Sequence, residues 1–332
     1  MLRISFINVG YGDSILVEEL HGSRRTFSML VDGGPPYAGT YCASYDLRPA
    51  RMPAFRYLQS HGIQSLDVLF LSHFHIDHVG GMPAVMKACA CGQVWSNYRL
   101  PDPACLEDLN RVRIESRTAA EMRLSLNLLA EMQRMAEADG KEIEVLGEQQ
   151  KTIALTGQLQ ADFFAIDPAL AGRTEILAQA ALNTADTAKA QRALVRLDGI
   201  QNAAGVALRL RYEGVRILLP ADLPHSYWRS YLKEPDSLRA DLLKIAHHGQ
   251  ADSMTEELAA AIRPRHAIVS VSSDNPLGAP APEVFAMFDP EVQLWATENI
   301  EVQPYFPRAE PHRAVSFGIF PDGTIVAAPE LL

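Results

Sequence analysis

Two histidine-rich segments, far apart in the chain, constrain the fold more than any other feature. The first, residues 73–78, reads H-F-H-I-D-H, and the second, residues 247–249, reads H-H-G. Each directly follows a short apolar run, residues 66–71 and 241–246, of the length expected for a buried strand. Because α/β folds place ligand sites at strand ends, we expect the two segments to meet in one pocket.

The spacing within residues 73–78 is typical of a metal site. In an extended turn, His73 and His75 point to the same side and can bind one cation. Asp77 and His78 follow one turn later, at a helix start, and can bind a neighbouring cation. Imidazole nitrogen and carboxylate oxygen suit Zn²⁺, and also Mn²⁺ or Fe. The segment therefore predicts one or two divalent ions, with Zn²⁺ as the first choice.

Two later segments supply candidates for the remaining ligands. Asp222 ends an apolar hairpin, residues 205–219, and can bridge two ions held about 3.5–4 Å apart. Either His248 or His247 can complete the shell of the first ion. The alternative for these histidines is a surface or core position unrelated to metal.

The order of the other predicted elements indicates an α/β domain. The chain opens with three strands in hairpin spacing, at residues 2–9, 14–18 and 27–31. A strand, a loop, a helix and a strand follow over residues 66–95, which is a βαβ signal. Alanine- and leucine-rich helical stretches come next, at residues 119–138 and 173–193. We therefore expect a single domain over residues 1–332, with a helical insertion at about residues 99–190.

The start of this expected insertion is basic. Four arginines precede or begin its first long helix: Arg111, Arg113, Arg117 and Arg123. A solvated helix face explains them most simply, and contact with a phosphate-bearing ligand is the alternative.

Composition narrows the class of protein. Hydrophobic residues make up 48% of the 332 residues and charged residues 21%, which is typical of a folded globular chain. The formal net charge of −10 argues against holding nucleic acid by bulk charge alone. No uncharged apolar run approaches the roughly 18 residues of a membrane helix, and residues 1–14 lack the features of a signal peptide. We expect a cytoplasmic protein, without a membrane partner, whose four cysteines are reduced thiols.

Five segments carry a family resemblance. They read V-G-Y-G-D-S at residues 9–14, V-D-G-G at 31–34, H-F-H-I-D-H at 73–78, L-L-P-A-D at 218–222 and L-K-I-A-H-H-G at 243–249. In this order they resemble the metallo-β-lactamase superfamily and, within it, the ComEC/Rec2-like branch of DNA-uptake proteins. The resemblance covers roughly residues 1–95 and 200–330. It implies an αββα sandwich of two mixed β-sheets with helices outside.

The resemblance also implies which residues hold the metals. One ion would be bound by His73, His75 and His248. The second ion would be bound by Asp77 and His78, and Asp222 would bridge the two.

Other site residues are implied around the metals. His247 would bind metal or touch a substrate phosphate, and Asp32 would orient the histidine loop from behind. Asp13 and Ser14 would line the cleft. Asn202 begins an N-A-A-G segment that resembles an Asn-rich segment of the ComEC-like branch.

The chain departs from the family pattern at two positions. The branch commonly carries a G-H-P segment after H-H-G, but this chain has Ala279 at the His position, so the second metal has one ligand fewer. Many superfamily members have a His before the bridging Asp, where this chain has Asn202 and its neighbours, and this favours the ComEC-like branch. His225 could substitute in principle, but a place on a helix surface explains it more simply.

The predicted site indicates a hydrolase. A zinc-class ion lowers the pKa of bound water to roughly 7, so that hydroxide is present at neutral pH. Asp77 is best placed to orient that water, and His247 is the second catalytic candidate.

The resemblance to the ComEC-like branch favours a metal-dependent phosphodiesterase or nuclease whose substrate is a phosphodiester, nucleic acid or nucleotide. Two alternatives remain open: an ester, thioester or lactone hydrolase, and a degenerate protein that binds a metal, a ligand or a partner without turnover. An oligomer or a protein partner is also open.

Overall fold

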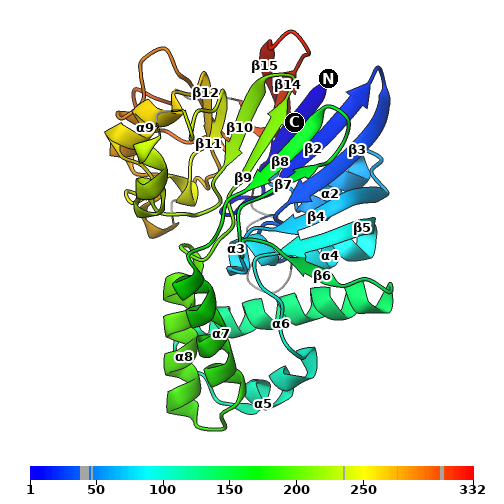
Figure 1. Cartoon of the computed structure of the whole chain (residues 1–332), viewed down its shortest axis with the longest axis vertical. Helices are drawn as coiled ribbons and strands as arrows, with labels where there is room; N and C mark the ends of the chain where they lie inside the picture. Colours follow the sequence, from blue (N-terminus) through cyan, green and yellow to red (C-terminus); the bar gives the residue numbers. More distant parts are fainter. Residues whose placement is uncertain (38–44, 46–47, 235, 275, 307–309) are drawn as a thin grey trace.

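Two mixed β-sheets lie face to face in the computed structural model, and helices cover their outer faces (Figure 1). The structure describes residues 1–37, 45, 48–234, 236–274, 276–306 and 310–332. The expected αββα sandwich is therefore confirmed. Cys89 and Cys91 are buried free thiols, whereas Cys42 lies outside the described residues.

The first sheet has eight strands among the described residues, in the order β15-β14-β1-β2-β3-β4-β5-β6. These are β1 (Leu2–Ile7), β2 (Ile15–His21), β3 (Arg24–Val31), β4 (Ser65–Leu71), β5 (Ala90–Ser96), β6 (Ile143–Val145), β14 (His312–Ile319) and β15 (Ile325–Leu331). Strands β3 to β6 pair in parallel, and the remaining pairs are antiparallel.

The second sheet has seven strands within the described ranges, in the order β13-β12-β11-β10-β9-β8-β7. These are β7 (Lys151–Ala154), β8 (Leu159–Phe163), β9 (Leu208–Tyr212), β10 (Val215–Leu219), β11 (Leu242–Lys244), β12 (His266–Val269) and β13 (Gln293–Ala296). Strands β10 to β13 pair in parallel, and β7 to β10 pair antiparallel.

Strand β4 shows why a mostly apolar run predicts a central strand. Leu69 and Leu71 belong to the core between the first sheet and its helices, whereas Val68 and Phe70 belong to the core between the two sheets. Both faces of β4 are therefore buried, as expected for a parallel strand inside a sheet.

The helices divide between the two outer faces. Those packed with the first sheet are α2 (Ala54–Ser60), α3 (Ile76–Val79), α4 (Met82–Ala88), α5 (Leu106–Arg111), α6 (Arg117–Ala138), α7 (Pro168–Leu182) and α8 (Thr187–Gln201). Those packed with the second sheet are α9 (Glu256–Ile262) and α10 (Pro282–Phe285). Short 3₁₀ turns are η2 (Pro103–Cys105), η3 (His225–Lys233), η4 (His247–Gly249) and η5 (Pro276–Gly278).

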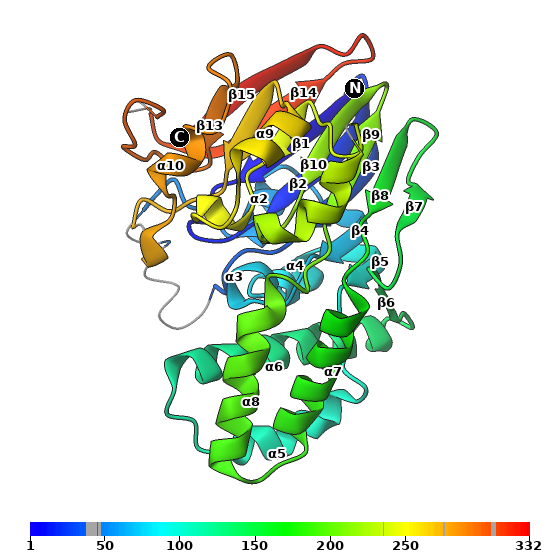
Figure 2. The same cartoon turned by 60° about the vertical axis from the view of Figure 1, so that its left-hand side comes forward.

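Residues 99–190, expected as a helical insertion, contribute to helices and sheets alike. Helices α5 to α8 extend from one end of the sandwich in both views (Figures 1 and 2). Strands β6, β7 and β8, however, extend the edges of the two sheets. Leu126 of α6 and Leu194 of α8 belong to the same buried cluster as Leu69 of β4, so these helices share a core with the first sheet.

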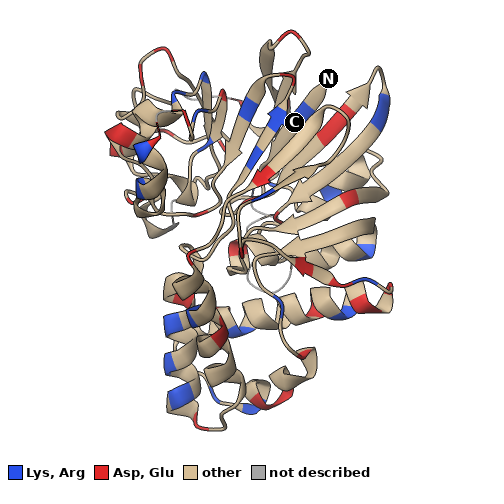
Figure 3. Ribbon diagram, viewed as in Figure 1, with Lys and Arg blue, Asp and Glu red and all other residues tan. Residues whose placement is uncertain are grey.

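Charged residues are spread over both sheets and the helices, and basic positions gather along α8 (Figure 3). Lys189, Arg192 and Arg196 are exposed there, at a spacing that places them on one face of the helix. None of the described helices combines the length and the apolar character needed to span a membrane.

Candidate metal centre

Three strand ends bring the predicted metal ligands together. Strand β4 leads into residues 73–78, β10 leads into Asp222, and β11 leads into His247 and His248. Because β10 and β11 pair in parallel, their carboxyl ends lie at the same edge of the second sheet. The two distant histidine segments thus meet at one site, as the sequence predicts.

Four side chains form a cluster that could hold a metal: Asp77, His78, Asp222 and His248. One ligand atom from each lies within 4.8 Å of all the others. The His248 Nε2 atom is 3.2 Å from Asp77 Oδ2 and 3.2 Å from Asp222 Oδ2. The His78 Nε2 atom is also 3.2 Å from Asp222 Oδ2. We call these four residues the four-donor cluster.

The imidazole rings of the cluster are oriented for metal binding. The Nδ1 atom of His248 is 3.0 Å from the Ser270 carbonyl, which only accepts, so in the neutral ring Nε2 keeps its lone pair. That buried Nε2 atom faces the carboxylates of Asp77 and Asp222 at 3.2 Å, and neither contact has the geometry of a hydrogen bond. The Nδ1 atom of His78 is likewise held 2.9 Å from Asp32 Oδ2. A carboxylate or carbonyl behind each imidazole is the usual support of a histidine metal ligand, so the residues present fit a divalent ion.

The charges of the cluster also favour a cation. Burial by itself lowers the pKa of His248, but neighbouring carboxylates, Asp222 first, raise it well above its usual range. The pKa of His78 is raised in the same way by Asp222, Asp77 and Asp32. The carboxylates therefore favour positive charge at this point, whether it is a proton or a divalent ion.

His73 and His75 form a second pair of donors beside the cluster. The His73 Nε2 atom is 3.2 Å from the His75 Nδ1 atom. Two nitrogens that bind one tetrahedral Zn²⁺ at about 2.0 Å lie roughly 3.3 Å apart, so the pair fits one ion. The other nitrogen of His75, Nε2, lies 3.1 Å from the backbone oxygen of Asp198 in α8. Sequence reasoning did not identify Asp198, because nothing in its neighbourhood marks it as close to residue 75.

The structure corrects the expected partner of His248. We expected it beside His73 and His75, but it lies against Asp77 and Asp222. The left-handed backbone of His248, at a φ of 52°, belongs to the turn that directs the ring there. Ala279, where a further ligand was missing from the pattern, is buried, and the four-donor cluster does not include that position.

Lys244 is a site residue that sequence reasoning missed. Its buried Nζ atom donates to the Ala221 carbonyl at 3.0 Å and to Asp222 Oδ1 at 3.2 Å, and it forms an ion pair with Asp13. Lys244 thus donates a hydrogen bond to one carboxylate oxygen of Asp222, Oδ1, while the other, Oδ2, faces His78 and His248. A lysine inside the apolar segment that becomes β11 was the available signal.

Asp13 and Ser14 do not line the pocket of about 840 Å³ that opens at the four-donor cluster, contrary to expectation. Both are buried, and Asp13 points inward to Lys244. The reason is local, because the Asp13 amide donates to the Asp77 carbonyl at 3.2 Å and so fixes the turn over the metal-binding segment.

His247 lies outside the four-donor cluster, on the wall of the pocket. Its Nδ1 atom is 2.8 Å from Asp252 Oδ1, and its Nε2 atom is 2.9 Å from the side-chain amide of Asn202. A carboxylate and an amide thus fix the ring from both sides. His225, the possible substitute ligand, begins the 3₁₀ turn η3 and is not part of the cluster.

The backbone at the site is strained at several non-glycine residues. Asp32, Ala221, His247 and His248 all have φ between 47° and 58°. Such left-handed conformations cost on the order of 1–3 kcal/mol each and are kept where the surrounding structure enforces them. Their concentration around the ligands is typical of a functional site.

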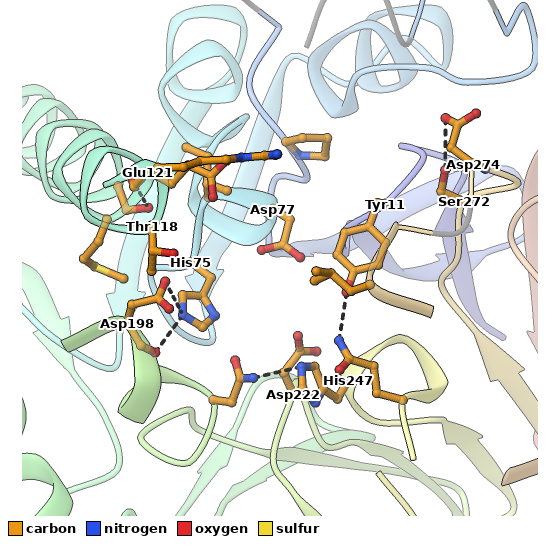
Figure 4. A pocket seen from close by; sticks show the side chains of 18 residues that line it. Tyr11, His75, Asp77, Thr118, Glu121, Asp198, Asp222, His247, Ser272 and Asp274 are labelled. Atoms are coloured by element: carbon orange, nitrogen blue, oxygen red, sulfur yellow. Dashed lines mark hydrogen bonds and ion pairs between the residues drawn. The ribbon is translucent and has the colours of Figure 1, made fainter. Parts of the chain in front are cut away.

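A pocket of about 840 Å³ opens at the cluster (Figure 4). Tyr11, Asp77, Asp222 and His247 line one side of it, and residues of α6 and α8 line the other. Of the arginines at the start of the expected insertion, Arg117 lines the pocket and pairs with Glu121, 2.9 Å away. Arg111 and Arg113 are exposed and pair with acidic neighbours, as in a solvated face.

Asp32→Asn is expected to lower the affinity for Mn²⁺ or Zn²⁺ about 10- to 100-fold, as measured by titration calorimetry. Asp32 accepts the Ser72 amide, the Ser72 hydroxyl and His78 Nδ1. An amide NH₂ placed against His78 would favour the tautomer with the hydrogen on Nε2, the nitrogen that faces the cluster. Asn tolerates the left-handed conformation of residue 32, so the substitution adds no backbone strain that could change the metal affinity by itself.

The matched control is Asp67→Asn. Asp67 also accepts the amide and hydroxyl of one serine, Ser28, but away from the metal centre. We expect unchanged metal affinity in this variant. Equal affinities of Asp32→Asn and the wild-type protein would contradict a role of Asp32 in orienting His78.

Comparison with known proteins finds a family match for the N-terminal part of the chain only. Residues 7–104 match the model of the metallo-beta-lactamase superfamily. The match includes the V-D-G-G segment and the H-F-H-I-D-H segment, and it supports assignment to that superfamily. The finer ComEC-like assignment rests on the sequence motifs alone.

Individual relatives are distant. The chain is 27% identical over 136 residues to cleavage and polyadenylation specificity factor subunit 3-II of Arabidopsis thaliana, covering 40% of this chain and 20% of that protein. Among solved structures, Zn²⁺-bound PqqB of Methylobacterium extorquens is similar with a TM-score of 0.39, 11% identity and coverage of 89% of this chain and 97% of that one. A putative Zn-dependent hydrolase of the metallo-beta-lactamase superfamily from Thermotoga maritima is similar with a TM-score of 0.40 and 10% identity. The match covers 89% of this chain and 98% of that one. At such TM-scores these likenesses add nothing to what the strand order already shows.

Proposed function

We propose that the protein is a metal-dependent phosphodiesterase or nuclease, with Zn²⁺ as the first choice of ion and Mn²⁺ or Fe as alternatives. The observation that supports this most is the four-donor cluster, of which Asp77 and Asp222 reach the wall of the pocket. A substrate in the pocket would therefore lie against the metal centre.

The side chains around the pocket suit hydrolysis. A divalent ion held by the four-donor cluster would supply Lewis acidity and would lower the pKa of water, so that hydroxide is available at neutral pH. Asp77 can accept a hydrogen bond from that water and orient it toward the substrate. His247, whose Nδ1 atom is held by Asp252, can pass a proton from Nε2 to the leaving group when the substrate replaces the Asn202 amide at that nitrogen.

Two observations favour a phosphodiester over other substrates. The Arabidopsis relative is named as subunit 3-II of a cleavage and polyadenylation specificity factor. The exposed cations Lys189, Arg192 and Arg196 lie along α8, and the end of this helix reaches the pocket at Asp198. Positive charge in a row attracts the phosphates of a nucleic acid or nucleotide.

The pocket wall supports a second candidate, an ester, thioester or lactone hydrolase. Glu121, Asp198 and Asp274 place carboxylates on the wall, and Met122 and Ile76 add apolar surface. Such a lining suits a substrate with little negative charge. The degenerate, non-catalytic alternative differs from both in that no substrate is turned over.

Hydrolysis of bis(p-nitrophenyl) phosphate by purified protein loaded with Mn²⁺ or Zn²⁺ is the deciding experiment. We expect release of p-nitrophenol, its loss on treatment with EDTA and its recovery when the metal is restored, because the donors require a cation to act. p-Nitrophenyl acetate serves as the acyl comparison.

Turnover of the acetate alone would overturn the phosphodiesterase proposal in favour of the acyl hydrolase. Less than one equivalent of metal after reconstitution, with no turnover of either substrate, would support the degenerate alternative.

A further inference from the structure

Tyr11 occupies the variable position of the V-G-Y-G-D-S segment and lines the metal pocket. The turn around it is pressed against the metal-binding segment, since a Cβ atom on Gly12 would lie 2.3 Å from the Asp77 backbone oxygen. Only glycine permits this approach. The turn places the Tyr11 ring on the imidazole of His248, with the ring centroids 4.4 Å apart. In Figure 4 the ring projects into the pocket beside Asp77.

The hydroxyl of Tyr11 has a donor beside it but no recorded acceptor. The Gln250 side-chain amide donates to the Tyr11 oxygen at 3.1 Å. Within the described part of the chain, no acceptor is recorded for the hydroxyl hydrogen. A phenol is protonated at neutral pH, so this hydrogen is available to a molecule in the pocket.

We propose that the Tyr11 hydroxyl donates a hydrogen bond to the substrate oxygen that gains negative charge in the transition state. The inference rests on the proposed function, under which this atom is a non-bridging phosphoryl oxygen. A fixed donor aimed at developing charge stabilises the transition state more than the bound substrate. Tyr11 is then a catalytic residue, and Gln250 positions its hydroxyl.

The chemistry favours hydrogen-bond donation over proton transfer to the leaving group. An efficient general acid has a pKa near the working pH, whereas a phenol ordinarily has a pKa of about 10. His247 lies on the same pocket and is the candidate for proton transfer. The Tyr11 contribution should therefore be independent of the leaving group.

Tyr11→Phe tests the inference, since it removes one oxygen and keeps the ring on His248. With Mn²⁺-loaded protein and bis(p-nitrophenyl) phosphate, we expect kcat to fall about 100-fold and KM to change less than about threefold. Calorimetric titration with orthovanadate, which mimics the transition state, should show a similar loss of affinity. The Mn²⁺ content should equal that of the wild-type protein.

Tyr227→Phe is the matched control, because that hydroxyl donates to the Ala165 carbonyl at 2.7 Å and does not line the pocket. It should retain wild-type kcat. Gln250→Leu keeps the Tyr11 hydroxyl but removes its orienting amide, so it should lose less activity than Tyr11→Phe.

Two results would overturn the inference: a Tyr11→Phe kcat within about threefold of wild type, or loss of Mn²⁺ in this variant, which would indicate a structural role. Failure of the proposed function is a separate outcome, since the wild-type protein would then not hydrolyse the diester. If the wild-type protein hydrolyses p-nitrophenyl acetate instead, the Tyr11→Phe variant can be tested on that ester. An unchanged kcat would then show that the Tyr11 hydroxyl is not a hydrogen-bond donor in ester hydrolysis either.

Discussion

Asp222→Asn is expected to lower kcat/KM for a phosphodiester by about a thousandfold or more and to remove most of the bound metal. The Oδ2 atom of Asp222 lies 3.2 Å from the Nε2 atoms of both His78 and His248, so it stands at the centre of the four-donor cluster. A metal contributes several kcal/mol to the stabilisation of a transition state, and each tenfold in rate corresponds to about 1.4 kcal/mol.

The isosteric amide cannot reproduce the double role of Asp222. One carboxylate oxygen accepts from Lys244 at 3.2 Å, and the other faces the imidazoles. In asparagine one of these positions becomes an NH₂ group, which repels either the ammonium or a metal ion. The variant therefore loses a ligand or its support, whichever way the amide turns.

Metal content by elemental analysis and kcat/KM on bis(p-nitrophenyl) phosphate are the two measurements. Asp289→Asn, an exposed aspartate that accepts the Glu291 amide, is the control and should behave as wild type. An Asp222→Asn protein that keeps a full complement of metal and more than a tenth of the activity would contradict the assigned centre.

The sequence predicted the convergence of the ligand loops because each lies at the end of a short apolar strand. Strands β4, β10 and β11 bury most of their side chains, so they are largely apolar and easy to recognise, and their charged exceptions are Asp67, Arg216 and Lys244. The polar residues that follow such strands must emerge at the sheet edge. Asp77, His78, Asp222 and His248 could therefore be identified without a structure.

Other parts of the architecture carry no comparable local signal. Strand β7, K-T-I-A, is largely exposed at the edge of the second sheet, so it lacks the apolar pattern of a strand. This is why residues 99–190 were expected to be a helical insertion, with no strand predicted there. Asp198 faces His75 across 123 positions of sequence, and only the packing of α8 against the sandwich brings them together.

Lys244→Met is expected to lower the free energy of unfolding by about 3–5 kcal/mol in the presence of EDTA. Lys244 is fully buried, and although burial lowers its pKa, the carboxylates of Asp13 and Asp222 outweigh this and raise it. The lysine therefore remains charged inside the protein. Its removal leaves two buried carboxylate oxygens without their cation. The free-energy cost of these unpaired charges exceeds the stabilisation that the buried methionine side chain provides.

Urea denaturation of the metal-free proteins measures the effect, and the double variant Lys244→Met/Asp13→Asn identifies its origin. If the loss comes from the unpaired carboxylate of Asp13, neutralising that group should restore part of the stability, and the two changes should not add. Lys87→Met is the control, because Lys87 forms an exposed ion pair with Glu131, worth about 0–1 kcal/mol. A loss below about 1 kcal/mol in Lys244→Met would mean that water or rearranged side chains stabilise the two aspartates, and that the ammonium does not hold Asp222 in its ligand position.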